Sequence, residues 1–312
     1  MADHRTIETG LYTLTATHCG TGQAAGAVDL PIARERHTGL PLVPATSIKG
    51  VVRDLAEGRR GGEPWSDDRR DELLGPDPPG ENGSPERLEA GCLVFTDGRL
   101  LAFPARSLQS PFMWVTCPLV IHRWRRDRRA LGLAVEDLFE LPSDLPAVAG
   151  PSLGDGKLVI EDYFYPQVRW ADQAVGALAA RWCRLLPPDE GDTRAGVGQR
   201  LAALPDTDFQ DLVRRTTPVN ARVQLTGGKT TDRWRNPVTG KDESGNLWYE
   251  ETLPSDCLIS VLVTSRRRNP DGVEALRRLL SDPNHRAIQI GGNETVGQGL
   301  CWWTPEENGD EG

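Results

Sequence analysis

Two glycine-bearing loops near opposite ends of the chain place the strongest constraint on its fold. The early loop, residues 37–50, reads HTGLPLVPATSIKG, and the late loop, residues 291–299, reads GGNETVGQG. Glycine lets a backbone approach a ligand closely and point its amides outward, and a lysine beside such a loop supplies a charge for phosphate. Both loops therefore favour a polyanionic ligand. Neither has the spacing of a nucleotide-hydrolase phosphate loop or of a dinucleotide-binding loop, which argues against a nucleotide cofactor.

The distribution of charge matters more than its sum. The 312 residues carry a formal net charge of -9 and a pI of about 5.2, which ordinarily argues against a nucleic-acid partner. Basic residues nevertheless gather in three runs, so one cationic groove on an acidic surface is compatible with the sequence. Alternatively, each run is a solvated face or a subunit contact. The runs are Arg34, Arg36, Lys49, Arg53, Arg59 and Arg60; Arg123, Arg125, Arg126, Arg128 and Arg129; and Arg266, Arg267 and Arg268.

Cysteine usage and hydropathy indicate a soluble protein in a reducing compartment. Six cysteines lie far apart with no Cys-x-x-Cys pair, so we expect buried thiols in a reducing cytoplasm rather than a zinc knuckle or a disulfide framework. No signal segment opens the chain, and no apolar run approaches the roughly 18 residues that cross a bilayer. We therefore expect a cytoplasmic protein with no membrane partner.

The early loop leads into an expected helix that ends near Gly58. Residues 10–17 alternate apolar and hydroxylated side chains, which predicts a strand, and residues 18–44 form a long loop with Asp29 in its middle. Thr46 or Ser47 is the expected cap of the helix, whose first turn would offer free amides to a phosphate. Its apolar residues fall on one face: Ile48, Val51, Val52 and Leu55. Lys49 and Arg53, four residues apart, would share another face.

The remaining pattern predicts an α+β fold with a split βαβ, ferredoxin-like core. Residues 219–225 and 246–253 form two strand-like segments on either side of a stretch too polar to pack, like a long projecting hairpin. Segments of about 61–90 and 134–156 are polar or proline-broken, and we interpret them as surface insertions. The other expected elements are a hairpin over 92–104 turning at Asp97-Gly98, a strand and then a helical segment over 113–124, strands at 157–160, 257–264 and 287–290, and helices at 171–186 and 270–280.

Three segments resemble the RAMP superfamily of CRISPR proteins. They are VDLPIARERHTGLP at 28–41, PATSIKG at 44–50 with Arg53 after it, and the glycine loop at 291–299. The Asp29-Leu-Pro-Ile block and the LWYEETLP block at 247–254 look most like the backbone subunit of the type III-B (Cmr) effector complex. The resemblance covers the first sixty residues, roughly 214–262, and the end of the chain.

The resemblance implies a single domain over residues 1–312, with a modified ferredoxin-like, RRM-like palm and a long thumb hairpin at about 219–253. Such a palm polymerises along a guide (CRISPR) RNA beside further copies of itself and other type III-B subunits. The thumb intercalates between the guide and a complementary target RNA. The target is cut at regular intervals, once per subunit, and the essential aspartate maps to Asp29.

This chemistry is physically reasonable for a carboxylate on a loop. Asp29 can bind a divalent metal, Mg²⁺ or Mn²⁺, or accept the proton of the attacking 2′-hydroxyl. Tyr249 and Glu250, at the thumb base, are the expected auxiliaries. Except for Glu35, no second carboxylate lies near Asp29 in sequence, so the spacing does not support a preformed two-metal site. The alternative is that Asp29 is a loop carboxylate bonded to backbone amides.

The expected RNA-binding residues come from both loops, the first basic run and the thumb. Lys49 would contact phosphate. The glycines would let backbone approach RNA, or alternatively serve tight turns. Trp234 would stack on a base or on a neighbouring subunit. The full set is Arg34, Arg36, Ser47, Lys49, Arg53, Trp234, Gly291, Gly292, Asn293, Thr295, Gly297 and Gly299.

Two alternative functions remain open from the sequence. The first is a scaffold subunit that binds guide RNA without cleaving the target, in which Asp29 is structural. The second is the guide-processing endoribonuclease of the same superfamily, which would use a catalytic histidine or tyrosine and cleave repeat RNA without partners. The long thumb and the Asp29 block argue against the second alternative.

Overall fold

A computed structural model describes residues 6–22, 28–76, 89–135, 144–152, 155–223, 233–235, 242–244, 247–266 and 270–307. One ten-stranded mixed sheet runs through it in the order β15-β16-β1-β14-β4-β5-β9-β6, with β2 paired to β4 and β3 to β14. The expected α+β class is confirmed. The strands of this sheet are β1 (Thr6–Thr13), β2 (Leu42–Val43), β3 (Leu93–Phe95), β4 (Gly98–Ala105), β5 (Met113–Thr116), β6 (Ala147–Val148), β9 (Leu201–Ala203), β14 (Leu258–Ser265), β15 (Ala287–Gln289) and β16 (Leu300–Pro305).

The two ends of the chain meet in the middle of this sheet. Strand β1 lies between β14 and β16 and pairs antiparallel with both. Its residue Thr9 is opposite Val261 on one side and Pro305 on the other. Side chains of β1 are almost all buried because the strand is central. The loop that follows β1 and the loop that precedes β16 therefore lie side by side, at the same end of two neighbouring strands.

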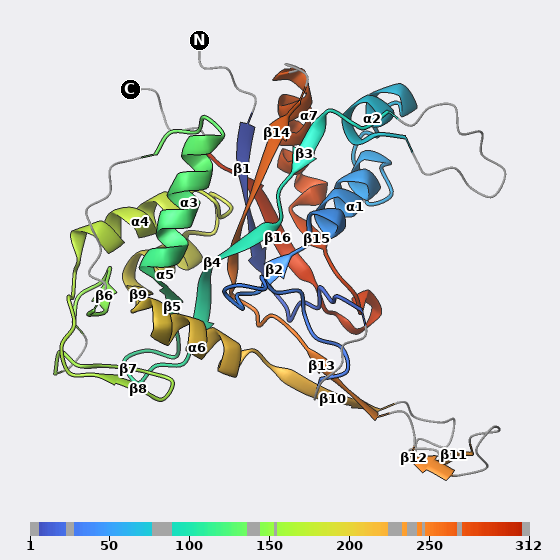
Figure 1. Ribbon diagram of the computed structural model, residues 1–312. Coiled ribbons are helices and arrows are strands. Elements are labelled where there is room, and N and C mark those ends of the chain that lie inside the picture. The colour runs from blue at the N-terminus through green and yellow to red at the C-terminus, as the bar shows by residue number, and fades with distance from the viewer. Residues whose placement is uncertain are drawn as a thin grey trace.

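Helices pack on the sheet in two groups (Figure 1). Helices α1, α2 and α7 lie to the right of β1 in this view, and α3, α4 and α5 lie to the left. The buried face of α1 consists of Ile48, Val52, Leu55 and Ala56, as the apolar spacing predicts, whereas Val51 is only half-buried. The helices are α1 (Ala45–Ala56), α2 (Asp67–Leu74), α3 (Pro118–Ala130), α4 (Gln173–Cys183), α5 (Gly191–Arg200), α6 (Asp206–Thr216) and α7 (Pro270–Ser281).

The expected side-chain cap of α1 is wrong. Pro44 occupies the N-cap position in an extended conformation, so Thr46 and Ser47 fall inside the first turn and neither caps the helix. Instead, the Ala45 N–H donates a 2.8 Å hydrogen bond to Oδ1 of Asp97, from the turn before β4. A carboxylate thus already complements the positive end of the α1 dipole.

The expected hairpin at Asp97-Gly98 is also wrong. Strands β3 and β4 do not pair with each other; both pair with the same edge of β14, Phe95 opposite Val263 and Arg99 opposite Ser260. Strand β14 is eight residues long, so it has room for the hydrogen bonds of both. The chain therefore continues along β14 as one interrupted strand, and the turn residues mark the interruption.

Both segments interpreted as surface insertions contribute to the core. Segment 61–90 contains α2, whose Leu73 and Leu74 are buried, and segment 134–156 contains β6, an edge strand that pairs with β9. Residues 77–88 and 136–143, within these segments, lie outside the described part of the chain. Two adjacent apolar residues, such as Leu73-Leu74 or Ala147-Val148, are too few to show a helical or strand period within a polar stretch. Other elements that the pattern did not predict include β2, α5, β9, α6, β16 and the β8 (Tyr163–Tyr165) partner of β7 (Leu158–Ile160).

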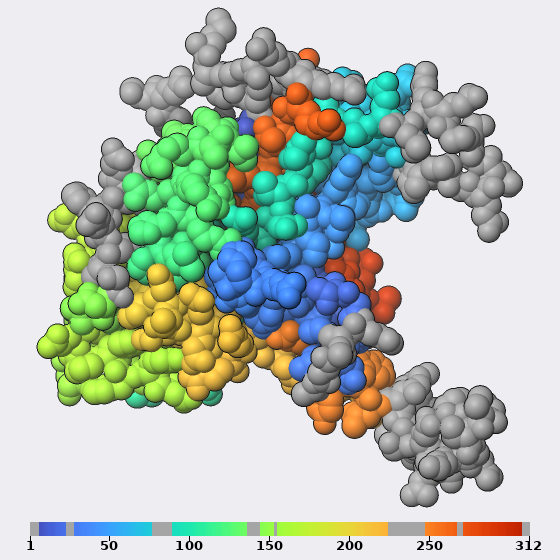
Figure 2. All heavy atoms as spheres, viewed as in Figure 1, coloured from blue at the N-terminus to red at the C-terminus, as the bar shows by residue number. Residues whose placement is uncertain are grey.

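The strand pair of the expected thumb is confirmed. Strands β10 (Val219–Val223) and β13 (Leu247–Glu251) pair antiparallel and project from the body. Farther out, β11 (Arg233–Arg235) pairs with β12 (Asp242–Ser244). The long loop of residues 18–44, which carries Asp29, is called the first loop from here on. In Figure 2 its blue surface lies directly against the orange base of this hairpin.

Candidate functional site

Asp29 is exposed at the base of the thumb. Its Oδ2 accepts a 2.8 Å hydrogen bond from the Tyr249 N–H. The next residue, Leu30, adds to β13 like a short strand: its N–H donates to the Tyr249 carbonyl oxygen, and the Glu251 N–H donates to the Leu30 carbonyl oxygen, both at 3.0 Å. One carboxylate oxygen is therefore held by a main-chain amide, as the structural alternative requires, while the side chain as a whole faces solvent.

The two expected auxiliaries of Asp29 lie in opposite environments. Tyr249 is 44% exposed, whereas Glu250 is only 2% exposed, because successive residues of a strand point to opposite faces. Glu250 accepts a hydrogen bond from the Asn293 side-chain amide, and its Oε2 lies 3.4 Å from Nε of Arg222. Glu250 thus links the thumb base to the late glycine loop, and Tyr249 is the auxiliary that shares solvent with Asp29.

Close turns explain two glycines of the late loop. Gly291 has φ of +86°, and a Cβ there would lie 2.2 Å from the His18 carbonyl oxygen. Gly299 has φ of +79°, and its Cβ would lie 2.2 Å from the Ile290 carbonyl oxygen. These positions cannot carry a side chain. The tight-turn reading therefore accounts for both glycines without a ligand.

Residues 292–297 of the late loop are exposed to solvent. Gly292, Asn293, Thr295 and Gly297 are all exposed. Gly292 has an ordinary backbone conformation and room for a Cβ, whose nearest neighbour, Cδ2 of His18, would lie at an ordinary van der Waals distance of 3.8 Å. Its N–H is bonded to the His18 carbonyl oxygen at 2.9 Å, so any ligand there would meet the Cα and the carbonyl rather than that amide.

The two glycine-bearing loops meet at an open pocket of about 450 Å³. Ser47 and Gly50 of α1 line one wall, and Gly291, Gly292 and His18 line the other. The expectation that the two ends of the chain form one groove holds for these residues.

Lys49 lies close to Arg53 on α1. Burial, and then the positive charge of Arg53, lower the pKa of Lys49, which agrees with the shared face expected from their spacing. Arg53 also donates to the Gly75 carbonyl oxygen. In the part of the chain that the structure describes, Lys49 has no carboxylate partner, so an anion bound there would relieve the repulsion between the two cations.

The other cations expected to bind RNA differ in their availability. Arg34 donates to the Gly39 carbonyl oxygen at 2.8 Å, to Thr217 Oγ1 at 2.9 Å and to Glu251 Oε1 at 2.5 Å. Arg36 is exposed. Arg34 therefore has an internal role, and Arg36 is the residue of the two that can reach a ligand. Trp234 falls in β11, and its side chain lies outside the described part of the chain.

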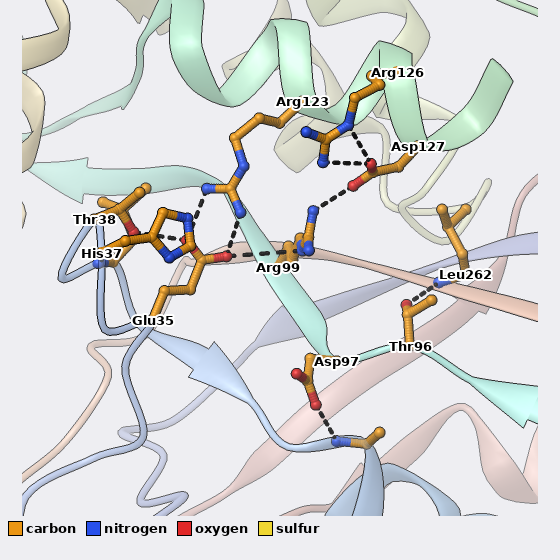
Figure 3. A network of polar contacts seen from close by, with 12 residues as sticks. Glu35, His37, Thr38, Thr96, Asp97, Arg99, Arg123, Arg126, Asp127 and Leu262 are labelled. Atoms are coloured by element: carbon orange, nitrogen blue, oxygen red, sulfur yellow. Dashed lines mark hydrogen bonds and ion pairs between the residues drawn. The ribbon is translucent and has the colours of Figure 1, made fainter. Parts of the chain in front are cut away.

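Three arginines of the α3 run, Arg123, Arg126 and Arg128, form internal ion pairs, the first two of which Figure 3 shows. Arg123 donates two hydrogen bonds, of 2.7 and 2.6 Å, to the carboxylate of Glu35. Arg99 lies 3.7 Å from the same carboxylate and also pairs with Asp127. Burial alone would raise the pKa of Glu35, but the hydrogen bonds from Arg123 and Thr38 and the nearby charges of Arg123 and Arg99 outweigh it and lower the pKa. Arg123 thus fastens the first loop to α3. Arg128 of the same run is buried and pairs with Glu8 and Glu306, so neither of these two arginines is available to a cationic groove.

The described part of the chain holds no ready-made metal centre. Over the described residues, no group of three or more His, Cys, Asp and Glu side chains is arranged to hold a metal ion. Asp29, the one expected metal ligand, is exposed, whereas its expected auxiliary Glu250 is buried and already bonded. None of the helices that the structure describes is long and apolar enough to span a membrane. All six cysteines are free thiols, five of them buried.

Glu251 is a neighbour of the Asp29 segment that the sequence pattern did not single out. Its carboxylate accepts from the Ile32 N–H at 3.0 Å as well as from Arg34. These partners lie more than 200 residues away in sequence, so spacing alone could not reveal them. The only signal is that two acidic residues stand together in an otherwise apolar and aromatic block.

Comparison with known proteins agrees with this geometry. The family model of the RAMP superfamily matches residues 11–302. The chain is 33% identical over 306 residues to the CRISPR system Cmr endoribonuclease Cmr4 of Pyrococcus furiosus, covering 96% of this chain and 95% of that protein. A crystal structure of oligomeric Cmr4 from Pyrococcus furiosus superimposes with a TM-score of 0.70 at 28% identity, covering 98% and 99% of the two chains. The same fold occurs, with a TM-score of 0.68 at 19% identity over 96% of each chain, in a cryo-EM structure of type III-B Cmr-beta bound to cognate target RNA. The chain therefore belongs to the RAMP superfamily, in the family of Cmr4.

Proposed function

We propose that the chain is a backbone subunit of a type III-B CRISPR effector, which polymerises along guide RNA and cleaves complementary target RNA. The observation that carries the proposal is the exposed Asp29 carboxylate, which the Tyr249 N–H holds at the thumb base, where the next residue, Glu250, bonds to the late glycine loop. The relative Cmr4 is an endoribonuclease, its crystal form is described as oligomeric, and a Cmr-beta complex binds target RNA. Free thiols support a reducing compartment, for which we propose the cytoplasm.

We infer that the palm is a ferredoxin-like, RRM-like unit. The strands β16, β1, β14 and β4 are neighbours in that order, and each pairs antiparallel with the next. With α1 after β1 and α7 after β14, this is the order expected of a split βαβ pair. The remaining strands extend the sheet beyond β4.

The guide RNA would be bound mainly through its phosphates. Lys49 supplies a cation without a carboxylate partner among the described residues, and Arg36 supplies an exposed one. Gly292 and Thr295 supply exposed loop backbone and a hydroxyl. Such contacts are independent of sequence and sensitive to salt, so base pairing with the guide would select the target.

Asp29 would act on a target nucleotide displaced at the thumb. Cleavage by a neighbouring 2′-hydroxyl needs that oxygen in line with the leaving 5′-oxygen. As the 2′-oxygen bonds to phosphorus, Asp29 Oδ1 would accept its proton, the bond from phosphorus to the 5′-oxygen would break, and the 5′-oxygen would take a proton from water. Tyr249 would help to place the nucleotide. We also propose a divalent metal, Mg²⁺ or Mn²⁺, with Asp29 as its protein ligand; when bound, it would offset charge on the phosphate. A metal held this way needs RNA and water for its other ligands, because the described residues supply no cluster.

The experiment is target cleavage in the reconstituted complex. Wild-type protein is assembled with guide RNA and the other effector subunits, and an end-labelled complementary target is added with and without Mg²⁺ or Mn²⁺. The proposal predicts a ladder of cuts at a constant interval, dependent on the metal. Uncut but bound target would support the scaffold alternative, and cleavage of precursor repeat RNA by the isolated chain would support the guide-processing one.

A further inference from the structure

The first loop and the thumb base are fastened together at several points. Asp29 and Leu30 bond to the backbone of β13. Beyond them, the Glu251 side chain reaches back over the loop, with Oε2 accepting from the Ile32 N–H at 3.0 Å and Oε1 from Arg34 at 2.5 Å. Alternate residues 30, 32 and 34 of the loop are thus all held by one residue of the thumb.

The same contacts reach both strands of the thumb. Arg34, held by Glu251, also donates to Thr217 Oγ1 at 2.9 Å, and Thr217 lies just before β10. Glu251 itself ends β13. The loop that carries Asp29 is therefore tied to the roots of both strands, and its position follows the position of the thumb (Figure 1).

Burial makes the Glu251 contacts strong and specific. The Glu251 and Arg34 side chains are only 11% and 20% exposed. Charge-assisted hydrogen bonds in such surroundings are about twice as strong as neutral ones. Without the carboxylate, the buried Ile32 N–H and the Arg34 guanidinium would both lose a partner, which favours local rearrangement of the loop.

We propose that Glu251 is a positioning residue, which clamps the first loop to the thumb base and so sets where the Asp29 carboxylate stands relative to the target strand. This inference rests on the proposed function. Glu251 touches neither RNA nor the reacting atoms; it acts through Ile32, Arg34 and the backbone around Asp29. A displaced carboxylate would still allow target binding and would cut slowly or at the wrong linkage, because reactivity falls steeply with misplacement of the reacting groups.

The test compares Glu251→Ala and Glu251→Gln in the assembled complex with guide RNA. We expect E251A to reduce the single-turnover cleavage rate at saturating target at least tenfold, to leave target affinity within twofold of wild type, and to spread the cut positions. E251Q keeps an oxygen for the Ile32 N–H and loses the charge, so it should restore most of the rate and the regular cut positions. A change in target affinity that matches the change in rate would overturn the proposal.

A matched control removes the same kind of contact elsewhere. Glu161 also accepts from a main-chain N–H and from a guanidinium, both of Arg106, at 2.6 to 2.8 Å. It lies at the β7–β8 turn, remote from the thumb. Glu161→Ala should leave the rate and the cut positions unchanged.

Comparison with Asp29→Ala separates the two proposals. If D29A stops cutting while E251A cuts like wild type, the clamp is refuted and the proposed function stands. If D29A cuts like wild type, the proposed function itself fails. If E251A does not fold, E251Q is the test. The clamp is refuted if E251Q shows the wild-type rate and cut pattern although its first loop is disordered, which faster amide exchange at Ile32 would reveal.

Discussion

The Tyr249 N–H donates a 2.8 Å hydrogen bond to Oδ2 of Asp29, joining two residues that lie 220 positions apart. This bond leaves the second carboxylate oxygen, Oδ1, without a hydrogen-bond partner among the described residues. The carboxylate is thus oriented by the thumb and remains able to accept a proton. Because the side chain is exposed, Oδ1 is open to solvent and to a ligand.

Lys49→Ala should weaken guide binding and reduce its salt dependence. Removal of one phosphate contact to single-stranded RNA lowers the slope of log affinity against log salt concentration by about 0.7. Guide affinity measured between low and high salt tests this. Arg129→Ala is the control, because Arg129 is an exposed cation on α3, and its removal should leave the slope unchanged. An unchanged slope in K49A would remove Lys49 from the guide interface.

Alanine at three positions of the late loop separates turn glycines from ligand-facing ones. Gly291→Ala should destabilise the protein most, since it adds a clash with the His18 carbonyl to the positive φ. Gly297→Ala, with positive φ but open space, should cost about 1–2 kcal/mol. Gly292→Ala should leave the melting temperature unchanged and lower guide affinity. If G291A melts like wild type, the turn explanation is wrong.

Asn293→Ala should loosen the thumb from the late loop. The buried Glu250 carboxylate would lose a donor, and an unsatisfied buried group costs about 1–3 kcal/mol. Urea unfolding of the isolated chain measures this. Thr295→Ala, on the same loop and also exposed, takes no donor from Glu250; it is the control and should unfold like wild type. Equal stability of N293A and wild type would contradict the link that we describe.

The lowered pKa of Glu35 predicts a pH dependence of stability. The carboxylate is bound by Arg123 and Thr38 in the folded state, so its contribution is present above the unfolded pKa of about 4.3 and is lost as the pH falls through the lower folded pKa. Glu35→Gln should therefore be less stable than wild type at pH 7, and the difference should shrink on acidification below pH 4. Melting temperatures across this range test the prediction, with Asp155→Asn, which breaks an exposed pair with Lys157, as control. A difference in melting temperature between E35Q and wild type that stays constant with pH would show that the ionisation of Glu35 does not contribute to stability.

Local patterns in the sequence identified the elements that carry the site. The apolar spacing on α1 predicted its buried face, and the i, i+4 spacing of Lys49 and Arg53 predicted their proximity. The alternating segments at 219–225 and 246–253 predicted the paired strands of the thumb. In each case the information lies within one or two turns of helix, or within one strand.

Features that depend on contacts between distant residues could not be predicted. Asp97 supplies the capping interaction of α1 from another element, and Glu35 takes both hydrogen bonds of Arg123 from a loop 88 positions away. The opposite burial of Tyr249 and Glu250 depends on which face of β13 meets the late loop. A pattern of residue types cannot decide which of two successive strand residues faces inward until the packing partner is known.

The most direct test of the account is target cleavage by a complex assembled with Asp29→Asn, an uncharged residue of nearly the same shape. We predict that target RNA binds with wild-type affinity and remains intact at every position of the regular ladder, with or without Mg²⁺ or Mn²⁺. Cutting at the wild-type rate and interval would show that the Asp29 carboxylate takes no part in the reaction and would contradict the account.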